Sequence, residues 1–128
     1  MLNLRRTTAT VGAAVLLATP LVALSATPAQ AADRNFRCSG ARVDFDVERD
    51  DGRYEVAVDI DRAPAGSRWR VTLRQNGKRF YHRVRVADRE GDVEVDRNRP
   101  NTRGRDTFKL RVKRIGGAPA CRSTIRVR

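Results

Sequence analysis

The chain has 128 residues, with 27 lysines and arginines against 15 aspartates and glutamates, one histidine and two cysteines. A net charge of +12 at pH 7 favours contact with anionic surfaces or polymers. The two cysteines lack the neighbouring cysteine or histidine that zinc sites use, and the sequence has neither a glycine-rich phosphate loop nor an EF-hand spacing. We therefore expect a binding protein with no catalytic residue, metal or cofactor. Calcium bound by the acid pairs Asp44/Asp46, Asp59/Asp61 and Asp50-Asp51 is the weaker alternative.

The first 31 residues (1–31) have the features of a cleavable export signal. Arg5 and Arg6 form a positively charged start, and an apolar run follows that leads to the small-x-small motif Ala29-Gln30-Ala31. The run is too short and too interrupted by proline for a good membrane span, so an uncleaved anchor is the weaker alternative. We predict a secreted protein in which residues 32–128 form one domain, strongly basic and without a further apolar segment.

From residue 32 the sequence indicates short antiparallel strands. A lead-in over 32–40 precedes two runs, 41–49 and 53–61, in which apolar side chains alternate with charged ones. The tripeptide Asp50-Asp51-Gly52 between them predicts a tight turn, because Asp-Gly tolerates the positive φ that a hairpin needs.

The stretch 68–86 predicts a β-hairpin, because two alternating runs flank Asn76-Gly77, a strong signal for a two-residue type I′ turn. Like charges directly opposite each other destabilise a sheet, so the outer face of this hairpin is the most informative feature of the sequence. That face is expected to pair Arg68 with Arg85, Arg70 with Arg83 and Arg74 with Arg79. The inner face is expected to pair Trp69 with Val84, Val71 with His82 and Leu73 with Phe80.

The rest of the chain predicts three more strands, over 92–96, 107–113 and 121–128. The longest loop, 97–106, separates the first two of these and holds four arginines.

Cys38 and Cys121 lie near the two ends of the predicted domain, and an even number of cysteines in an exported chain indicates a disulfide. In the chain-entropy model, a bridge across so long a loop stabilises the fold by about 4–5 kcal/mol.

Seven short strands with turn signals about every 8–12 residues predict an all-β fold, a seven-stranded antiparallel β-sandwich. In strand number, order and spacing, and in Trp69 on the third strand, the chain resembles the fibronectin type III and immunoglobulin-like sandwiches. It departs from true immunoglobulin domains in having no cysteine on the second strand and no corner tyrosine. The resemblance implies one sheet of strands 41–49, 53–61 and 92–96, and a second of 121–128, 107–113 and the hairpin. It implies no ligand.

This arrangement sorts the outward side chains by charge, with acids dominating the first sheet and only cations on the second. A β-bulge in any strand would reverse the facing of the residues beyond it. The candidate polyanion-binding residues on the second sheet are Arg68, Arg70, Arg74, Arg79, Arg83, Arg85, Lys109, Arg111 and Lys113.

The charge pattern predicts a monomeric binding module for an anionic polymer of the cell envelope or extracellular matrix, since the guanidinium fork suits phosphate and carboxylate. One alternative is that the cations only solvate the surface. Another is a structural or inhibitory domain that contacts a protein partner through loops such as 97–106. His82, the single histidine, is expected to face inward without a catalytic role.

Overall fold

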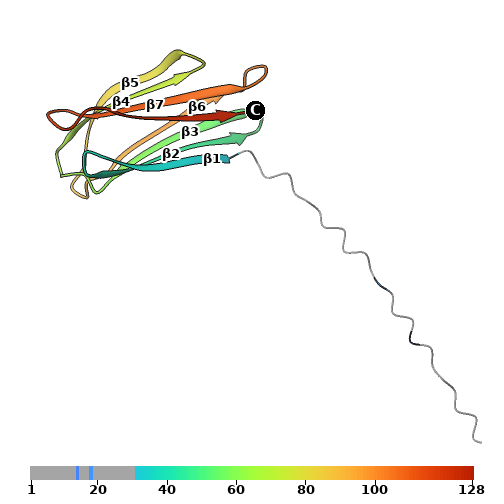
Figure 1. The fold of residues 1–128 in the computed structure, drawn as a ribbon, viewed down its shortest axis with the longest axis horizontal. Helices are drawn as coiled ribbons and strands as arrows, with labels where there is room; N and C mark the ends of the chain where they lie inside the picture. Colours follow the sequence, from blue (N-terminus) through green and yellow to red (C-terminus); the bar gives the residue numbers. More distant parts are fainter. Residues whose placement is uncertain (1–13, 15–17, 19–30) are drawn as a thin grey trace, which may run out of the picture.

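The computed structural model describes Ala14, Ala18 and residues 31–128, so the predicted export signal lies almost entirely outside the described residues. The described part folds into eight β-strands without a helix (Figure 1). None of its elements is therefore a helix long and apolar enough to cross a membrane. The strands are β1 (Ala31–Cys38), β2 (Ala41–Asp50), β3 (Arg53–Asp61), β4 (Arg68–Gln75), β5 (Lys78–Val86), β6 (Val93–Pro100), β7 (Asp106–Arg114) and β8 (Cys121–Val127).

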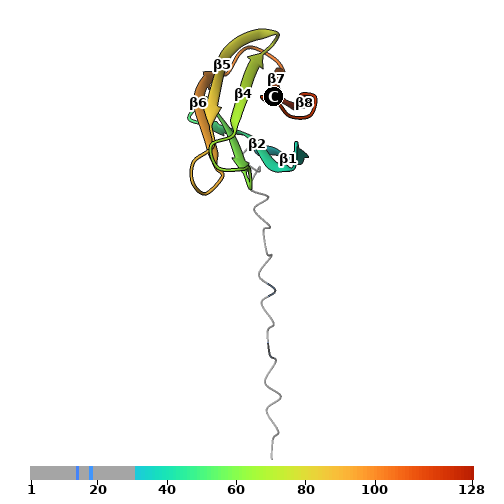
Figure 2. The ribbon, with the colours of Figure 1, turned by 90° about the vertical axis from the view of Figure 1, so that its left-hand side faces the viewer.

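The strands form two antiparallel four-stranded sheets, in the orders β1-β2-β3-β6 and β5-β4-β7-β8, which stack as two layers (Figures 1 and 2). The predicted division of strands between the sheets is confirmed. The strand number is corrected from seven to eight, because the predicted lead-in over 32–40 contains β1, which pairs with β2 from Ala31↔Glu48 to Cys38↔Ala41. Ser39-Gly40 joins them in a tight turn with positive φ at both residues, 46° and 82°.

The core lies between the layers and is filled by the inward side chains of both sheets. Its largest fully buried side chains include Trp69, Tyr54, Phe45 and Phe108. The Tyr54 and Phe108 rings meet edge to face with centroids 5.4 Å apart. Burial of Trp69 confirms its predicted inward facing, and its indole Nε1 donates a hydrogen bond to Ser67 Oγ at 2.8 Å.

Both edges of the sandwich are closed by contacts between the sheets. At one edge the predicted disulfide is confirmed: it joins Cys38, at the end of β1, to Cys121, at the start of β8, with their Cα atoms 5.9 Å apart. At the other edge, arginines of β6 lie over aromatic rings of β5, with Arg97 Cζ 4.7 Å from the Tyr81 ring centroid. The β1/β8 and β5/β6 edges lie on opposite sides in Figure 2.

The strand predicted over 92–96 continues as β6 to Pro100, so the predicted loop 97–106 is wrong in its first part. Polar residues at 97–99 conceal this extension from the alternation pattern. The guanidinium groups nevertheless pack as flat surfaces, with Arg99 Cζ 4.5 Å from the Phe80 ring centroid. The remaining segment, 101–105, is short, and the buried carboxylate of Asp106 accepts hydrogen bonds from both the backbone N–H and the hydroxyl of Thr102.

The Asn76-Gly77 turn is confirmed, with φ of 51° and 82°, and so is the Arg74↔Arg79 pair beside it. The predicted register fails at the next step, because a β-bulge between Leu73 and Arg74 leaves Phe80 as an extra residue on β5. Both aromatic rings are covered as a result: Tyr81 faces the core at 4 % exposure, and Phe80 packs edge to face on Phe108 at 6.3 Å.

Beyond the bulge, every predicted pair of the hairpin is replaced. Val84 and His82 were expected to face inward and are instead exposed on the outer side of the sheet. The predicted Arg68–Arg85 and Arg70–Arg83 pairs do not form. The observed pairs are Arg68↔Val86, Trp69↔Arg85, Arg70↔Val84, Val71↔Arg83, Thr72↔His82 and Leu73↔Tyr81.

Candidate functional site

The candidate site is the outer side of the β5-β4-β7-β8 sheet, which we call the basic face. Arg83 and Arg85 are the only predicted candidates that do not lie on it, and two cations of β8 extend it across the sheet. No acidic side chain points outward from these four strands. The cations of the basic face are Arg68, Arg70, Arg74, Arg79, Lys109, Arg111, Lys113, Arg122 and Arg126.

Cations of the basic face stand directly opposite one another on neighbouring strands. Arg74 faces a cation on each side, Arg79 on β5 and Lys109 on β7. The pairs Arg70↔Lys113 and Arg111↔Arg122 repeat the pattern. Each such pair costs about 0.2–1 kcal/mol relative to a neutral pair. Of the three arginine pairs that the sequence predicted, Arg74 with Arg79 forms, whereas Arg70 faces Lys113 of β7 and Arg68 faces Val86.

Within the described part of the chain, no ion pair is seen between these cations and an acid. On the other sheet, by contrast, Arg42 Nε lies 3.5 Å from Asp44 Oδ1. Lys113 is held by carbonyl groups instead, and its Nζ donates hydrogen bonds to Gly117 O at 2.9 Å and Ala118 O at 2.6 Å. The positive charge of the face is therefore available to an external anion.

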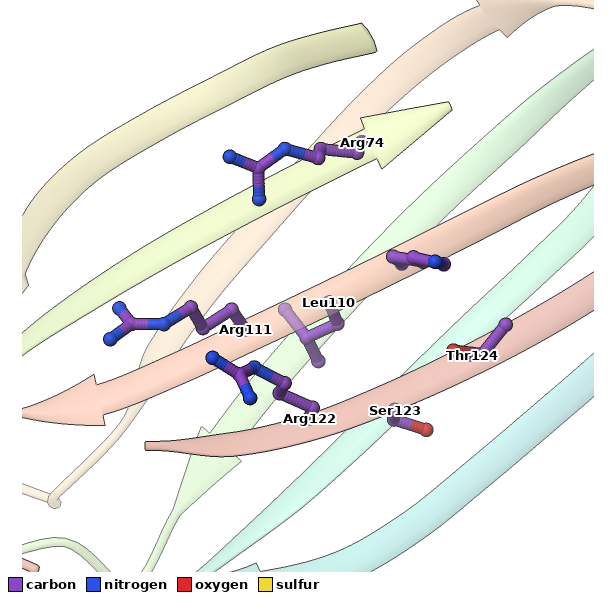
Figure 3. Close-up of a pocket in the computed structure, with 7 residues that line it drawn as sticks. Arg74, Leu110, Arg111, Arg122, Ser123 and Thr124 are labelled. Atoms are coloured by element: carbon purple, nitrogen blue, oxygen red, sulfur yellow. The ribbon is translucent and has the colours of Figure 1, made fainter. Parts of the chain in front are cut away.

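A depression of about 420 Å³ lies in the basic face over β4, β7 and β8 (Figure 3). The side chains of Arg74, Arg111 and Arg122 extend in the same direction from three neighbouring strands, β4, β7 and β8. Guanidinium and hydroxyl donors together suit the oxygens of phosphate, sulfate or carboxylate groups. The lining residues are Arg74, Lys109, Leu110, Arg111, Arg122, Ser123 and Thr124.

His82 lies on the basic face rather than in the core, and its Nδ1 is 2.8 Å from Thr72 Oγ1. Partial removal from water lowers the pKa of His82, and the nearby charges of Arg79 and Arg70 lower it further. A neutral imidazole therefore adds no charge to the repulsion around it at neutral pH. Thr72 also faces outward, yet flanking side chains cover it to 4 % exposure.

The other two predicted candidates, Arg83 and Arg85, occupy the inner side of β5, opposite Val71 and Trp69. Because β5 is an edge strand, Arg83 is still exposed and Arg85 is half-buried. Arg85 Nη1 donates a hydrogen bond to Tyr81 Oη at 3.1 Å. These arginines thus lie along the β5/β6 edge of the sandwich. They leave the outer side of the sheet because of the bulge, which the alternation pattern does not reveal.

The outer side of the β1-β2-β3-β6 sheet, which we call the acidic face, carries the opposite charge. Its acids also stand opposite one another, as in Asp33↔Asp46 and Asp44↔Asp59. Burial raises the pKa of Asp46 and Asp59, and neighbouring carboxylates raise both further. Three cations, Arg37, Arg42 and Arg53, also lie on this face, but acids outnumber them. The acids of this face are Asp33, Asp44, Asp46, Glu48, Asp50, Glu55, Asp59, Asp61, Glu94 and Asp96.

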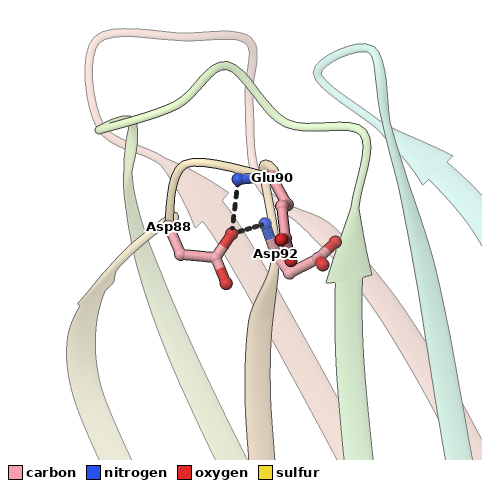
Figure 4. Close-up of side chains that lie close together, drawn as sticks. All are labelled: Asp88, Glu90 and Asp92. Atoms are coloured by element: carbon pink, nitrogen blue, oxygen red, sulfur yellow. Dashed lines mark hydrogen bonds between the residues drawn. The ribbon is translucent and has the colours of Figure 1, made fainter.

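Three further acids gather in the loop before β6 (Figure 4). Asp88 Oδ1 accepts hydrogen bonds from the backbone N–H groups of Glu90 and Asp92, both at 2.9 Å. The carboxylate thereby stabilises the turn before β6. Hydrogen bonding within the loop is a sufficient reason for the cluster, and we assign no metal to it.

The basic face is thus a broad surface of single charge that could recognise a ligand. It combines an open sheet, opposed cations and a depression rich in donors. Compared with protein-family models, with curated proteins and with solved structures, the chain gave no match.

Proposed function

We propose that the protein is an exported, disulfide-linked β-sandwich module whose basic face binds an anionic polymer of the cell envelope or extracellular matrix. The observation that carries the proposal is the set of directly opposed cations on one sheet face without an acid among them. Holding these charges together costs stability, and a polyanion laid across them would offset that cost and release counterions.

The geometry of a sheet favours a polymer over a single small anion. Neighbouring strands lie about 4.8 Å apart, and outward side chains along one strand repeat every 6.6–6.8 Å or so. The cations therefore form a two-dimensional grid on which successive phosphate or carboxylate groups can each meet a guanidinium. The depression beside Arg111 and Arg122 gives that grid one recessed position.

Export is part of the proposal and is supported by two features. Residues 1–31 have the charge, apolar run and cleavage motif of a secretory signal. The Cys38–Cys121 bridge suits an oxidising compartment, where disulfides persist. The immunoglobulin-like or fibronectin type III-like classification is likewise proposed, on strand order and on the buried Trp69.

No observation favours the alternative of a loop-mediated protein contact. The loop on which it depended is shortened by β6, and Thr102 in the remaining segment is tied to Asp106. An inhibitory loop would need an extended, accessible segment that a partner protein can bind.

The test compares two variants with equal loss of charge, Arg74→Gln/Arg111→Gln on the basic face and Arg103→Gln/Arg105→Gln in the exposed loop. Binding of the oxidised protein to polyphosphate and to polygalacturonate is measured by fluorescence titration over a range of salt concentrations. We expect the basic-face variant to bind more weakly and to lower the slope of log K against log salt by roughly 1.4–1.8, at 0.7–0.9 per lost contact. The loop variant should change little. Equal losses in the two variants would mean that the cations only solvate the surface.

A further inference from the structure

The acidic and basic faces lie on opposite sides of one domain, so they cannot neutralise each other within a single copy. The two sheets are separated by the buried core, a layer of roughly 10 Å. Each face consequently keeps its own repulsion: Arg74 stands between two cations, and Asp59 stands between Asp44 and Glu94.

The two faces also match each other in spacing. Both are antiparallel sheets of four strands, so both present charges at the strand separation in one direction and at the two-residue repeat in the other. The acidic row Asp44–Asp59–Glu94 and the basic row Arg79–Arg74–Lys109 each run across three neighbouring strands, so the distances between successive charges are nearly the same in both. An acidic face laid on a basic face can bring many opposite charges together at once.

We propose that the basic face of one copy of the protein binds the acidic face of a second copy. The contact relieves repulsion on both surfaces, which a small counterion does less completely. Burial raises the pKa of Asp46 and Asp59, and neighbouring carboxylates raise it further, which agrees with an acidic face that positive charge would stabilise.

The symmetry of the contact sets the kind of assembly. Two different surfaces meet, so the contact is heterologous and leaves one free acidic face and one free basic face at the ends. Assembly can then continue copy by copy, and the expectation of a simple monomer is limited to conditions in which salt screens the faces. The net positive charge opposes growth at long range, whereas the contact acts at distances shorter than the Debye length.

The proposal is tested with two variants that each disable one face. Arg74→Gln/Lys109→Gln/Arg111→Gln retains the acidic face, and Asp44→Asn/Asp46→Asn/Asp59→Asn retains the basic face. Sedimentation velocity is measured for the full oxidised protein, for each variant and for their mixture. Each sample is studied at about 10 mM and about 1 M salt, where the Debye length is about 30 Å and 3 Å.

At low salt we expect the sedimentation coefficient of the wild type to rise with concentration, and at high salt to return to that of the monomer. Each variant alone should remain monomeric. Their mixture should form one-to-one pairs and nothing larger, because each pair has only disabled faces at its ends.

Three results would overturn the proposal: a wild type that stays monomeric at low salt, variants that associate like the wild type, or assembly that persists at high salt. If a triple variant fails to fold, as judged by circular dichroism, Arg111→Gln and Asp59→Asn test the same contact. The acid-to-amide variant should retain polyphosphate binding, so a failure of self-association is distinguishable from a failure of polyanion binding.

Discussion

Arg74 offers a direct measure of the cost of the basic face. Its neighbours across both strand pairs, Arg79 and Lys109, are cations, so Arg74→Gln removes two repulsive pairs at once. At about 0.2–1 kcal/mol for each pair, the variant should gain about 0.4–2 kcal/mol in free energy of unfolding at low salt. Glutamine keeps most of the aliphatic stem of this half-buried side chain, so little packing is lost.

Thermal unfolding followed by circular dichroism checks this expectation. For a domain of this size, about 1 kcal/mol corresponds to a shift of roughly 4–8 °C in Tm. The gain should be largest at about 10 mM salt and should shrink at about 1 M, where the Debye length falls to about 3 Å. Arg103→Gln, in the exposed loop, is the matched control and should leave Tm nearly unchanged.

Arg74→Gln would contradict this expectation if it lowered Tm at low salt, or if it raised Tm equally at both salt concentrations. The first result would mean that the guanidinium stabilises the sheet, and the second that the effect comes from packing and not from charge. The same substitution should weaken polyphosphate binding, since a charge that costs stability in the free protein is expected to be useful in the complex.

Three further predictions concern the rest of the fold. Trp69→Ala should lower the free energy of unfolding by about 3–5 kcal/mol in urea titrations, because a fully buried indole and its bond to Ser67 are lost; an unchanged midpoint would contradict this. Reduction of the disulfide should cost about 2–5 kcal/mol, and equal Tm values with and without reductant would exclude a stabilising bridge. Burial alone would raise the pKa of Asp106, but hydrogen bonds from Thr102, Asn76 and Gln75 outweigh it and lower that pKa below its usual 3.8. The resulting stabilisation is complete above the unfolded-state pKa and is lost as pH falls through the folded-state pKa, so Asp106→Asn should flatten the loss of stability in acid.

Alternation alone was sufficient to predict the strands that have one buried and one solvated face. Val43, Phe45 and Val47 on β2 and Phe108, Leu110 and Val112 on β7 face the core as predicted, because a two-residue period is a local property of an extended chain. The Asn76-Gly77 turn and the Cys38–Cys121 bridge were predictable for a different reason: each depends on residue types whose chemistry allows few alternatives.

Tertiary contacts decided the features that alternation misses. β1 forms because the chain can pair with β2 after the Ser39-Gly40 turn, although its own pattern is weak. β6 continues to Pro100 because the guanidinium groups of its arginines pack on aromatic rings of β5.

The bulge at Phe80 has the largest effect on the candidate site. It exists where the other sheet can cover both Phe80 and Tyr81, and the sequence of the hairpin carries no information about that sheet. By shifting β5 by one residue, it moves Arg83 and Arg85 off the basic face and brings His82 onto it. The sequence therefore determined that one sheet is cationic, whereas packing between the sheets determined which residues of β5 belong to its outer surface.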